Sequence, residues 1–260
     1  MSEKITLANQ KGGTAKTSTA AALYSGLSLR GFKVLGIDLV AQANFSFIMS
    51  ADSNNSDIVD VLAGKSNITD AVQQIDRGDF ISASKKLSAV DFLITGSKRA
   101  FLLRRALEPM RDRYDFVIID TPPNLGTITI NALTASTGVI IPSFAEIFSV
   151  QGIVNLCDTV KEIKSTVNAE LINHGVLITR HKPYVRVQRE TASAIKEIAG
   201  QIGVKVFNTP IRDSVVITEA TSLRRDIFAH KPNSGAALDY SAFIDELLND
   251  LSLSQKRRQK

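Results

Sequence analysis

The sequence predicts a single α/β domain built on a mostly parallel, twisted sheet with helices on both faces. Apolar runs of four to seven residues alternate with amphipathic helical patterns, which is typical of repeated βα units. A chain of 260 residues with 44% hydrophobic content can bury one full core. No internal repeat or low-complexity linker divides it, so we predict one domain over residues 1–253 and a basic, unstructured tail over residues 254–260.

The expected elements follow in order from these patterns. Short apolar runs predict strands at Ile5–Ala8, Val34–Asp38, Phe92–Thr95, Phe116–Asp120, Gly138–Pro142, Gly175–Thr179 and Lys205–Asn208. Apolar residues at helical spacing predict helices at Thr17–Leu29, Lys98–Arg113, Ile128–Ala135, Val150–Ser165, Val187–Ile202 and Ala236–Leu251. The polar stretch Ala51–Asn55 is expected to be a loop.

Charge and composition narrow the functional classes. The formal net charge is +5, and four of the positive charges belong to the tail residues Lys256, Arg257, Arg258 and Lys260, so the high pI says little about the folded surface. The chain starts without an apolar signal segment and has no run of 18 apolar residues, so we expect a soluble, cytoplasmic protein. Cys157 is the only cysteine, which excludes an intrachain disulfide and a cysteine-based metal cluster.

The strongest local signal is a glycine-containing loop directly after the first expected strand. Residues 8–18 are Ala-Asn-Gln-Lys-Gly-Gly-Thr-Ala-Lys-Thr-Ser. Such a turn into a helix points backbone N–H groups and the helix dipole at one place, which suits a phosphate. Lys16 would contact the β- and γ-phosphates and Thr17 would bind Mg²⁺. The general motif fails at Gln10 and Ala15, so the alternative is an ordinary glycine turn before an amphipathic helix that carries an exposed lysine.

A family resemblance decides between these interpretations. Lys11-Gly-Gly-x-x-Lys16-Thr17 resembles the deviant Walker A motif of the ParA/Soj/MinD superfamily of P-loop ATPases. The resemblance implies a P-loop fold with ATP and Mg²⁺ as cofactors, and a homodimer in which Lys11 reaches the phosphates of the partner's ATP. A flexible lysine suits that task. The implied nucleotide-binding residues in this loop are Lys11, Gly12, Gly13, Thr14, Ala15, Lys16, Thr17 and Ser18.

Further motifs extend the resemblance over roughly residues 4 to 250. The segment from Val34 to Asn44 resembles the D-x-D switch of the family, and the segment from Tyr114 to Gly126 resembles its Walker B strand. These motifs imply a magnesium site made by Thr17, Asp38 and Asp120, and catalytic roles for Lys11, Lys16 and Asp38. Segments 137–152 and 210–220 also resemble the family, and the second implies that Pro210 and Arg212 bind the nucleotide.

The switch departs from the family at one position. Val40 stands where the resemblance implies the aspartate that orients or activates the attacking water. Valine has neither a charge nor an acceptor, so we expect an ATPase that is slow or inactive in hydrolysis. The alternative is that Val40 only extends its strand while another carboxylate takes over the role.

The resemblance further implies non-specific DNA binding by the ATP-bound dimer, association with the nucleoid, and a ParB-like centromere-binding partner in plasmid or chromosome partition. The candidate DNA-binding residues are Lys182, Arg186, Arg189, Arg224 and Arg225. A third basic set is diluted by nearby carboxylates and contains Lys98, Arg99, Arg104, Arg105, Arg111 and Arg113. For each cluster, the alternative is an ordinary solvated surface.

Other members of the superfamily offer competing functions. A MinD-like membrane switch needs a C-terminal helix with a free apolar side. The stripe formed by Tyr240, Phe243, Ile244, Leu247, Leu248 and Leu251 is instead expected to pack on the core, so membrane binding is not expected. A small-molecule ligase or kinase of the same fold is a further alternative. A nitrogenase-reductase-like protein needs bridging cysteines, which the single Cys157 does not supply, so that class is not expected. We also expect no N-terminal operator-binding domain, because only ten residues precede the P-loop.

Overall fold

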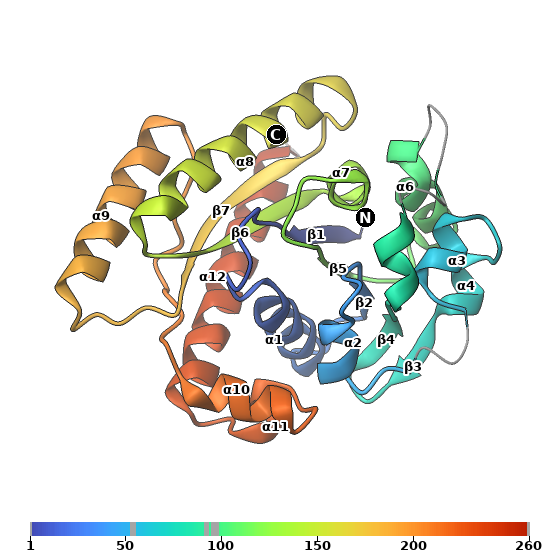
Figure 1. Cartoon of the computed structure of the whole chain (residues 1–260), viewed down its shortest axis with the longest axis horizontal. Coiled ribbons are helices and arrows are strands. Elements are labelled where there is room, and N and C mark those ends of the chain that lie inside the picture. The colour runs from blue at the N-terminus through green and yellow to red at the C-terminus, as the bar shows by residue number, and fades with distance from the viewer. Residues whose placement is uncertain (1, 53–55, 91–93, 95–98, 259–260) are drawn as a thin grey trace.

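The computed structural model describes residues 2–52, 56–90, 94 and 99–258 (Figure 1). A seven-stranded sheet has the order β3-β4-β2-β5-β1-β6-β7. All neighbouring strands are parallel except β3 and β4. The strands are β1 (Glu3–Leu7), β2 (Val34–Asp38), β3 (Gln73–Ile75), β4 (Gly78–Ile81), β5 (Phe116–Asp120), β6 (Gly138–Phe144) and β7 (Ile172–Thr179). This arrangement confirms the predicted fold class.

Helices cover both faces of the sheet (Figure 1). The α-helices are α1 (Lys16–Leu29), α2 (Asn44–Ile48), α3 (Ile58–Leu62), α4 (Ile68–Ala71), α6 (Leu102–Leu107), α7 (Thr127–Ala135), α8 (Ile147–Thr166), α9 (Arg186–Gln201), α10 (Val215–Ser222), α11 (Ile227–His230) and α12 (Gly235–Arg258). The described residues also form three 3₁₀ helices: η1 (Lys85–Ala89), η2 (Arg99–Phe101) and η3 (Glu108–Met110).

Alternate residues of the central strands point to opposite faces of the sheet and pack into the hydrophobic core on each face. Phe116 and Ile118 of β5 pack into the core that contains α1 and α12, whereas Val117 and Ile119 pack into the core that contains α3, α6 and α7. Helices α8 and α9 bury a third cluster against β6 and β7. Strands covered on both faces are apolar throughout, which is why the period-2 alternation of a half-exposed strand is missing from the sequence.

Several expected elements differ from the structure. The antiparallel β3–β4 pair and the short helices α2, α3, α4, α10 and α11 were not predicted. The helix expected at Lys98–Arg113 is divided into η2, α6 and η3, and Pro109 lies at the start of η3, where its ring cannot continue an α-helix. Lys98 lies outside the described residues, as does most of the strand expected at Phe92–Thr95.

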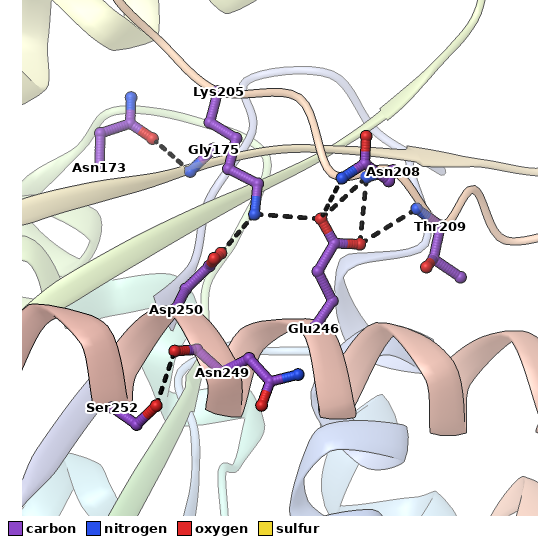
Figure 2. Close-up of polar contacts among 9 residues, drawn as sticks. All are labelled: Asn173, Gly175, Lys205, Asn208, Thr209, Glu246, Asn249, Asp250 and Ser252. Atoms are coloured by element: carbon purple, nitrogen blue, oxygen red, sulfur yellow. Dashed lines mark hydrogen bonds and ion pairs between the residues drawn. The ribbon is translucent and has the colours of Figure 1, made fainter.

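The segment expected as a strand at Lys205–Asn208 contacts β7 through only the isolated bridge between Val206 and Val176. Its polar groups turn instead toward α12 (Figure 2). The carboxylate of Glu246 accepts hydrogen bonds from the backbone N–H groups of Asn208 and Thr209 and pairs with Lys205 at 3.0 Å. Backbone donors used by a side chain are not available for a strand ladder.

Helix α12 is docked on the core, as predicted. Five residues of its apolar stripe are buried, namely Tyr240, Phe243, Ile244, Leu247 and Leu251, and Leu248 is partly buried. Carboxylates on its polar side pair with cations of the same chain: Asp239 with Arg212, Asp245 with Arg30, and Glu246 with Lys205. The helical backbone continues to Arg258, further into the basic tail than expected. None of the helices in the described part of the chain combines the length and apolarity that a bilayer crossing needs.

Candidate nucleotide site

The phosphate loop connects β1 to α1 at the carboxyl edge of the sheet. The side-chain amide of Asn9 donates to the carbonyl of Pro142 at 2.7 Å, and its oxygen accepts from the Lys11 N–H at 2.9 Å. Gly13 and Ala15 both adopt left-handed backbone conformations, with φ of 75° and 62°. Glycine adopts this conformation without strain, whereas an alanine there costs roughly 1 kcal/mol or more. The loop therefore keeps its left-handed conformation at Ala15 in spite of this cost.

The loop has an open outer side and an anchored inner side. Gly12 and Gly13 are exposed, and a Cβ atom added to either would meet nothing within 4 Å. Thr14 is buried, and its carbonyl accepts a hydrogen bond from the hydroxyl of Thr179 at the end of β7. Ser18 lies in the first turn of α1. The open backbone of the glycines fits the close approach of a phosphate group.

Lys16 lies under the loop rather than in solvent. Its side chain is buried, and its ammonium donates to the Lys11 carbonyl at 3.0 Å. Burial lowers the pKa of Lys16, and the nearby Asp120 carboxyl partly opposes this effect. The alternative of an exposed lysine on an ordinary amphipathic helix is therefore wrong for this chain.

Asp120 ends β5 directly beside the phosphate loop. Its Oδ2 accepts a hydrogen bond from the Thr17 hydroxyl at 2.6 Å, whereas its Oδ1 is buried without a hydrogen-bond partner in the described part of the chain. Burial, together with the charge of Asp38, raises the pKa of Asp120 to about 8. A buried carboxyl oxygen of this kind needs a proton or a cation.

Asp38 lies next to Asp120, because the β2–β5 register pairs the two residues directly. Its Oδ1 accepts from the Val40 N–H at 2.9 Å, and its Oδ2 accepts from both the N–H and the hydroxyl of Ser46 at 2.8 Å. Burial raises the pKa of Asp38 in spite of these bonds. Two adjacent carboxyl groups and the Thr17 hydroxyl form an all-oxygen donor set, which fits the hard cation Mg²⁺.

Val40 lies in the turn that follows β2 and is half-buried. Its N–H is used by Asp38 and its carbonyl accepts from Ala43 at 2.8 Å, so the main chain closes the turn without help from the side chain. The Val40 side chain offers only hydrocarbon. The carboxylate of Asp38 accepts three hydrogen bonds from Val40 and Ser46, which hold it in place at the end of β2.

Comparisons with known proteins agree with this geometry. A family model described as an AAA domain matches residues 2–173. The chromosome-partitioning ATPase Soj of Treponema pallidum is 32% identical over 95% of this chain and 98% of its own length. The chromosome partitioning protein ParA of Caulobacter vibrioides is 31% identical over 94% of this chain and 93% of its own length. The chain belongs to the ParA/Soj family of P-loop ATPases.

Solved structures extend the likeness. Cobyrinic acid a,c-diamide synthase of Mycobacterium smegmatis, solved with a bound ATP analogue and magnesium, superposes with a TM-score of 0.84. The synthase is 27% identical in sequence to this chain, and the match covers 97% of this chain and 96% of the synthase.

The signature lysine of this ParA/Soj family member is engaged within its own chain. The Lys11 ammonium forms an ion pair with the carboxylate of Glu146, the residue before α8. The two side chains are 39% and 50% exposed, so water screens the pair strongly. The sequence motif around Glu146 resembled the family, but nothing in the sequence indicated that it pairs with Lys11.

The second segment that was predicted to bind the nucleotide, with Pro210 and Arg212, also reaches the carboxyl edge. Ile211 donates its N–H to the carbonyl of Ile178 in β7, which places Pro210 and Arg212 beside the strand that anchors Thr14. The guanidinium of Arg212 is held by Asp239 of α12 through bonds of 2.7 and 2.8 Å. Sequence analysis missed Asp239, Ser46 and Asn9 as positioning residues, because no local sequence pattern indicates which partners they bond.

The basic residues expected to contact DNA fall into two separate sets. Lys182 pairs with Asp213 at 3.0 Å, Arg186 pairs with Glu190 at 2.7 Å, and Arg189 donates to the carbonyl of Pro183. Arg186 and Arg189 lie in the first turn of α9, which packs beside α8, and Lys182 lies in the loop just before it.

Arg224 and Arg225 form the second set, between α10 and α11 on another part of the molecule (Figure 1). The guanidinium of Arg224 stacks on the ring of Phe47 in α2 and donates to the carbonyl of that residue at 3.3 Å. Arg225 is exposed. The protomer therefore does not gather all the predicted DNA-binding residues on one face.

Proposed function

We propose that this protein is a Mg-ATP-dependent dimerising switch of the ParA type, used in plasmid or chromosome partition, in which ATP hydrolysis is impaired. One observation carries the proposal. Lys16, Thr17, Asp38 and Asp120 are assembled at the carboxyl edge of the sheet, while position 40 offers only a hydrocarbon side chain.

Nucleotide binding follows from charge placement. Lys16 and the N–H groups of the loop present positive charge to a triphosphate, and Thr17 and Asp120 hold the metal with Asp38 beside them. Bound Mg²⁺ supplies neutralisation of phosphate charge and a template for the nucleotide. The ATP analogue and magnesium in the structure of the M. smegmatis relative support this assignment.

Hydrolysis makes a further demand that binding does not. A water molecule must be oriented in line with the scissile bond, and in phosphoryl transfer this requires a polar group at a fixed position. The Val40 side chain cannot accept a hydrogen bond, and the carboxylate of Asp38 already accepts three hydrogen bonds from Val40 and Ser46. We therefore expect ATP binding and dimer closure to proceed while turnover stays near background.

Dimerisation depends on Lys11. Its ammonium is partly exposed and its only partner among the described residues is Glu146, so an exposed ion pair is all that opposes its release toward a partner's phosphates. Such pairs contribute about 0.2–1 kcal/mol, whereas a contact with a triphosphate joins several charges in a more enclosed site.

DNA binding is assigned to the start of α9, with a ParB-like protein as the partner that acts on the switch. Arg186 is 82% exposed, and Lys182 and Arg189 lie on the same segment. Exposed arginines and lysines of this kind contact phosphates without reading sequence. A membrane-binding role like that of MinD is not favoured, because the apolar stripe of α12 is used by the core.

Light scattering with Mg-ATP tests the proposal. The chain is expected to change from monomer to dimer on addition of Mg-ATP, and Lys11→Ala is expected to stay monomeric while still binding nucleotide. Lys161→Ala, on the exposed side of α8, is the matched control and should dimerise normally. Dimers that persist in Lys11→Ala, or a chain that stays monomeric at saturating Mg-ATP, would contradict the proposal.

A further inference from the structure

Asp213 pairs with two cations of the basic segment, residues 180–189, which runs from the end of β7 into α9. Its Oδ1 accepts a hydrogen bond from Arg180 Nε at 3.2 Å, and its Oδ2 lies 3.0 Å from the ammonium of Lys182. Lys182 is one of the residues predicted to contact DNA. Two cations of the basic segment therefore converge on one carboxylate that comes from another part of the chain.

Backbone hydrogen bonds hold Asp213 against the start of the basic segment. The Asp213 N–H donates to the carbonyl of His181 at 3.2 Å, and the His181 N–H donates to the carbonyl of Ile211 at 2.9 Å. The Asp213 side chain is 27% exposed, whereas those of Arg180 and Lys182 are 57% and 39% exposed. The carboxylate is thus fixed in place and is less accessible than the two cations that it pairs with.

Contacts on two sides fix the position of Arg180. Its backbone has a φ of 50°, in the left-handed region, which is strained for a residue with a Cβ atom. Its guanidinium lies over the ring of Phe144 at the end of β6, 5.0 Å from the ring centre, and Asp213 holds its Nε. A strained backbone of this kind persists where the surrounding contacts require it.

These contacts keep the Asp213 carboxyl group ionised. The hydrogen bond from Lys182 lowers the pKa of Asp213, burial opposes this effect, and the hydrogen bond from Arg180 lowers the pKa further. A carboxylate and a phosphate accept the same hydrogen bonds from ammonium and guanidinium groups. A phosphate that approaches Arg180 and Lys182 therefore meets a negative charge that is already paired with both cations.

We propose that Arg180 and Lys182 form a pair that binds phosphate groups of DNA, and that Asp213 competes with the DNA for this pair. The inference rests on the proposed function, because that function identifies the polyanion as DNA. It adds Arg180 to the contact residues and makes Asp213 the residue that limits affinity. Ion pairs of exposed cations are weak and screened by salt, and a duplex presents many phosphates, so DNA can displace the carboxylate.

Titration of random-sequence duplex with the full chain in Mg-ATP tests the competition. Asp213→Asn keeps the size of the side chain and removes its charge, so affinity at low salt is expected to rise about two- to tenfold and the salt slope to steepen by about 1. Asp213→Glu keeps the charge and should bind like the parent chain. Asp158→Asn removes an exposed carboxylate of α8 and is the matched control, which should change neither quantity.

A background without the two cations separates their release from a general effect of charge. In Arg180→Ala/Lys182→Ala, adding Asp213→Asn is expected to change affinity less than twofold. An affinity of Asp213→Asn at or below that of the parent chain would overturn the proposal. A gain that persists in full without Arg180 and Lys182 would overturn it as well.

Immobilised heparin distinguishes a failure of this inference from a failure of the proposed function. Heparin is a sulfated polyanion, so it tests the two cations whether or not DNA is the ligand. Asp213→Asn should elute at a higher salt concentration than the parent chain and Asp158→Asn. If it does so while neither Asp213→Asn nor the parent chain binds duplex, the DNA-binding part of the proposed function is wrong and the competition by Asp213 for a polyanion stands. Equal elution of Asp213→Asn and the parent chain would overturn the competition itself.

Discussion

The carboxyl edge of the sheet and the basic surface at the start of α9 are held in different ways. Asp38 and Asp120 are completely buried, and neighbouring strands in fixed register bring them together. Arg186, in contrast, is 82% exposed, and its ion-pair partner among the described residues is Glu190, one turn further along the same helix. Motifs at the edge therefore specify a geometry, whereas basic residues on the surface specify only a charge.

Asp120→Asn tests the buried edge with the largest expected effect. The pKa of Asp120 is raised by burial to about 8, so the stability it contributes is fully present below its unfolded value near 4 and is lost as pH rises through 8. The neutral asparagine removes this loss. Each unit of pKa corresponds to about 1.4 kcal/mol, so at pH 8 the nucleotide-free variant is expected to be more stable than the parent chain, by up to about 5 kcal/mol.

Thermal unfolding of both proteins at pH 5 and pH 8, without nucleotide or metal, measures the effect. The difference between them should shrink toward pH 5. If the stability of the two proteins changed equally with pH, the pKa of Asp120 would not be raised by its burial, and the prediction would be wrong.

The double variant Arg186→Ala/Arg189→Ala tests the exposed surface. If both arginines contact DNA phosphates, affinity for random-sequence duplex should fall about tenfold and the salt slope by about 2. Titrations at several salt concentrations measure both quantities, and Arg224→Ala/Arg225→Ala reports on the second basic set. A truncation after Gln255 isolates the tail, and loss of all binding from that truncation alone would exclude the α9 surface.

Glu146→Gln has the smallest expected effect, because it removes a single exposed ion pair, the one between Glu146 and Lys11 of the phosphate loop. Freed from Glu146, Lys11 should reach a partner more readily, and the dissociation constant of the Mg-ATP dimer should fall by up to about fivefold. Analytical ultracentrifugation measures it. A weaker dimer would mean that Glu146 contributes to the interface itself.

The same contrast explains what the sequence could predict. Val34–Asp38 and Phe116–Asp120 were predicted with their observed bounds because fully buried parallel strands are continuous apolar runs. The β3–β4 pair was missed because Gln73–Ile75 is short and mostly polar, and its pairing with Gly78–Ile81 depends on tertiary contacts. The site residues Lys16, Thr17 and Asp120 followed from motifs.

Positioning residues could not be predicted in this way. Ser46, Asp239 and Glu146 act through partners that are 8, 27 and 135 positions away in the chain. No local pattern marks such contacts. The turn after β2 brings Ser46 to Asp38, the carboxyl edge of the sheet brings Glu146 to Lys11, and α12 brings Asp239 to Arg212.

The central claim is that the carboxyl edge holds Mg-ATP but lacks the group that orients water. Single-turnover ATP hydrolysis by the chain and by Val40→Asp, measured beside ATP affinity, tests it most directly. We expect turnover near background in the chain itself and an increase of about 10²–10⁴-fold in Val40→Asp, with ATP affinity changed only slightly. Equal rates in the two proteins would contradict the claim.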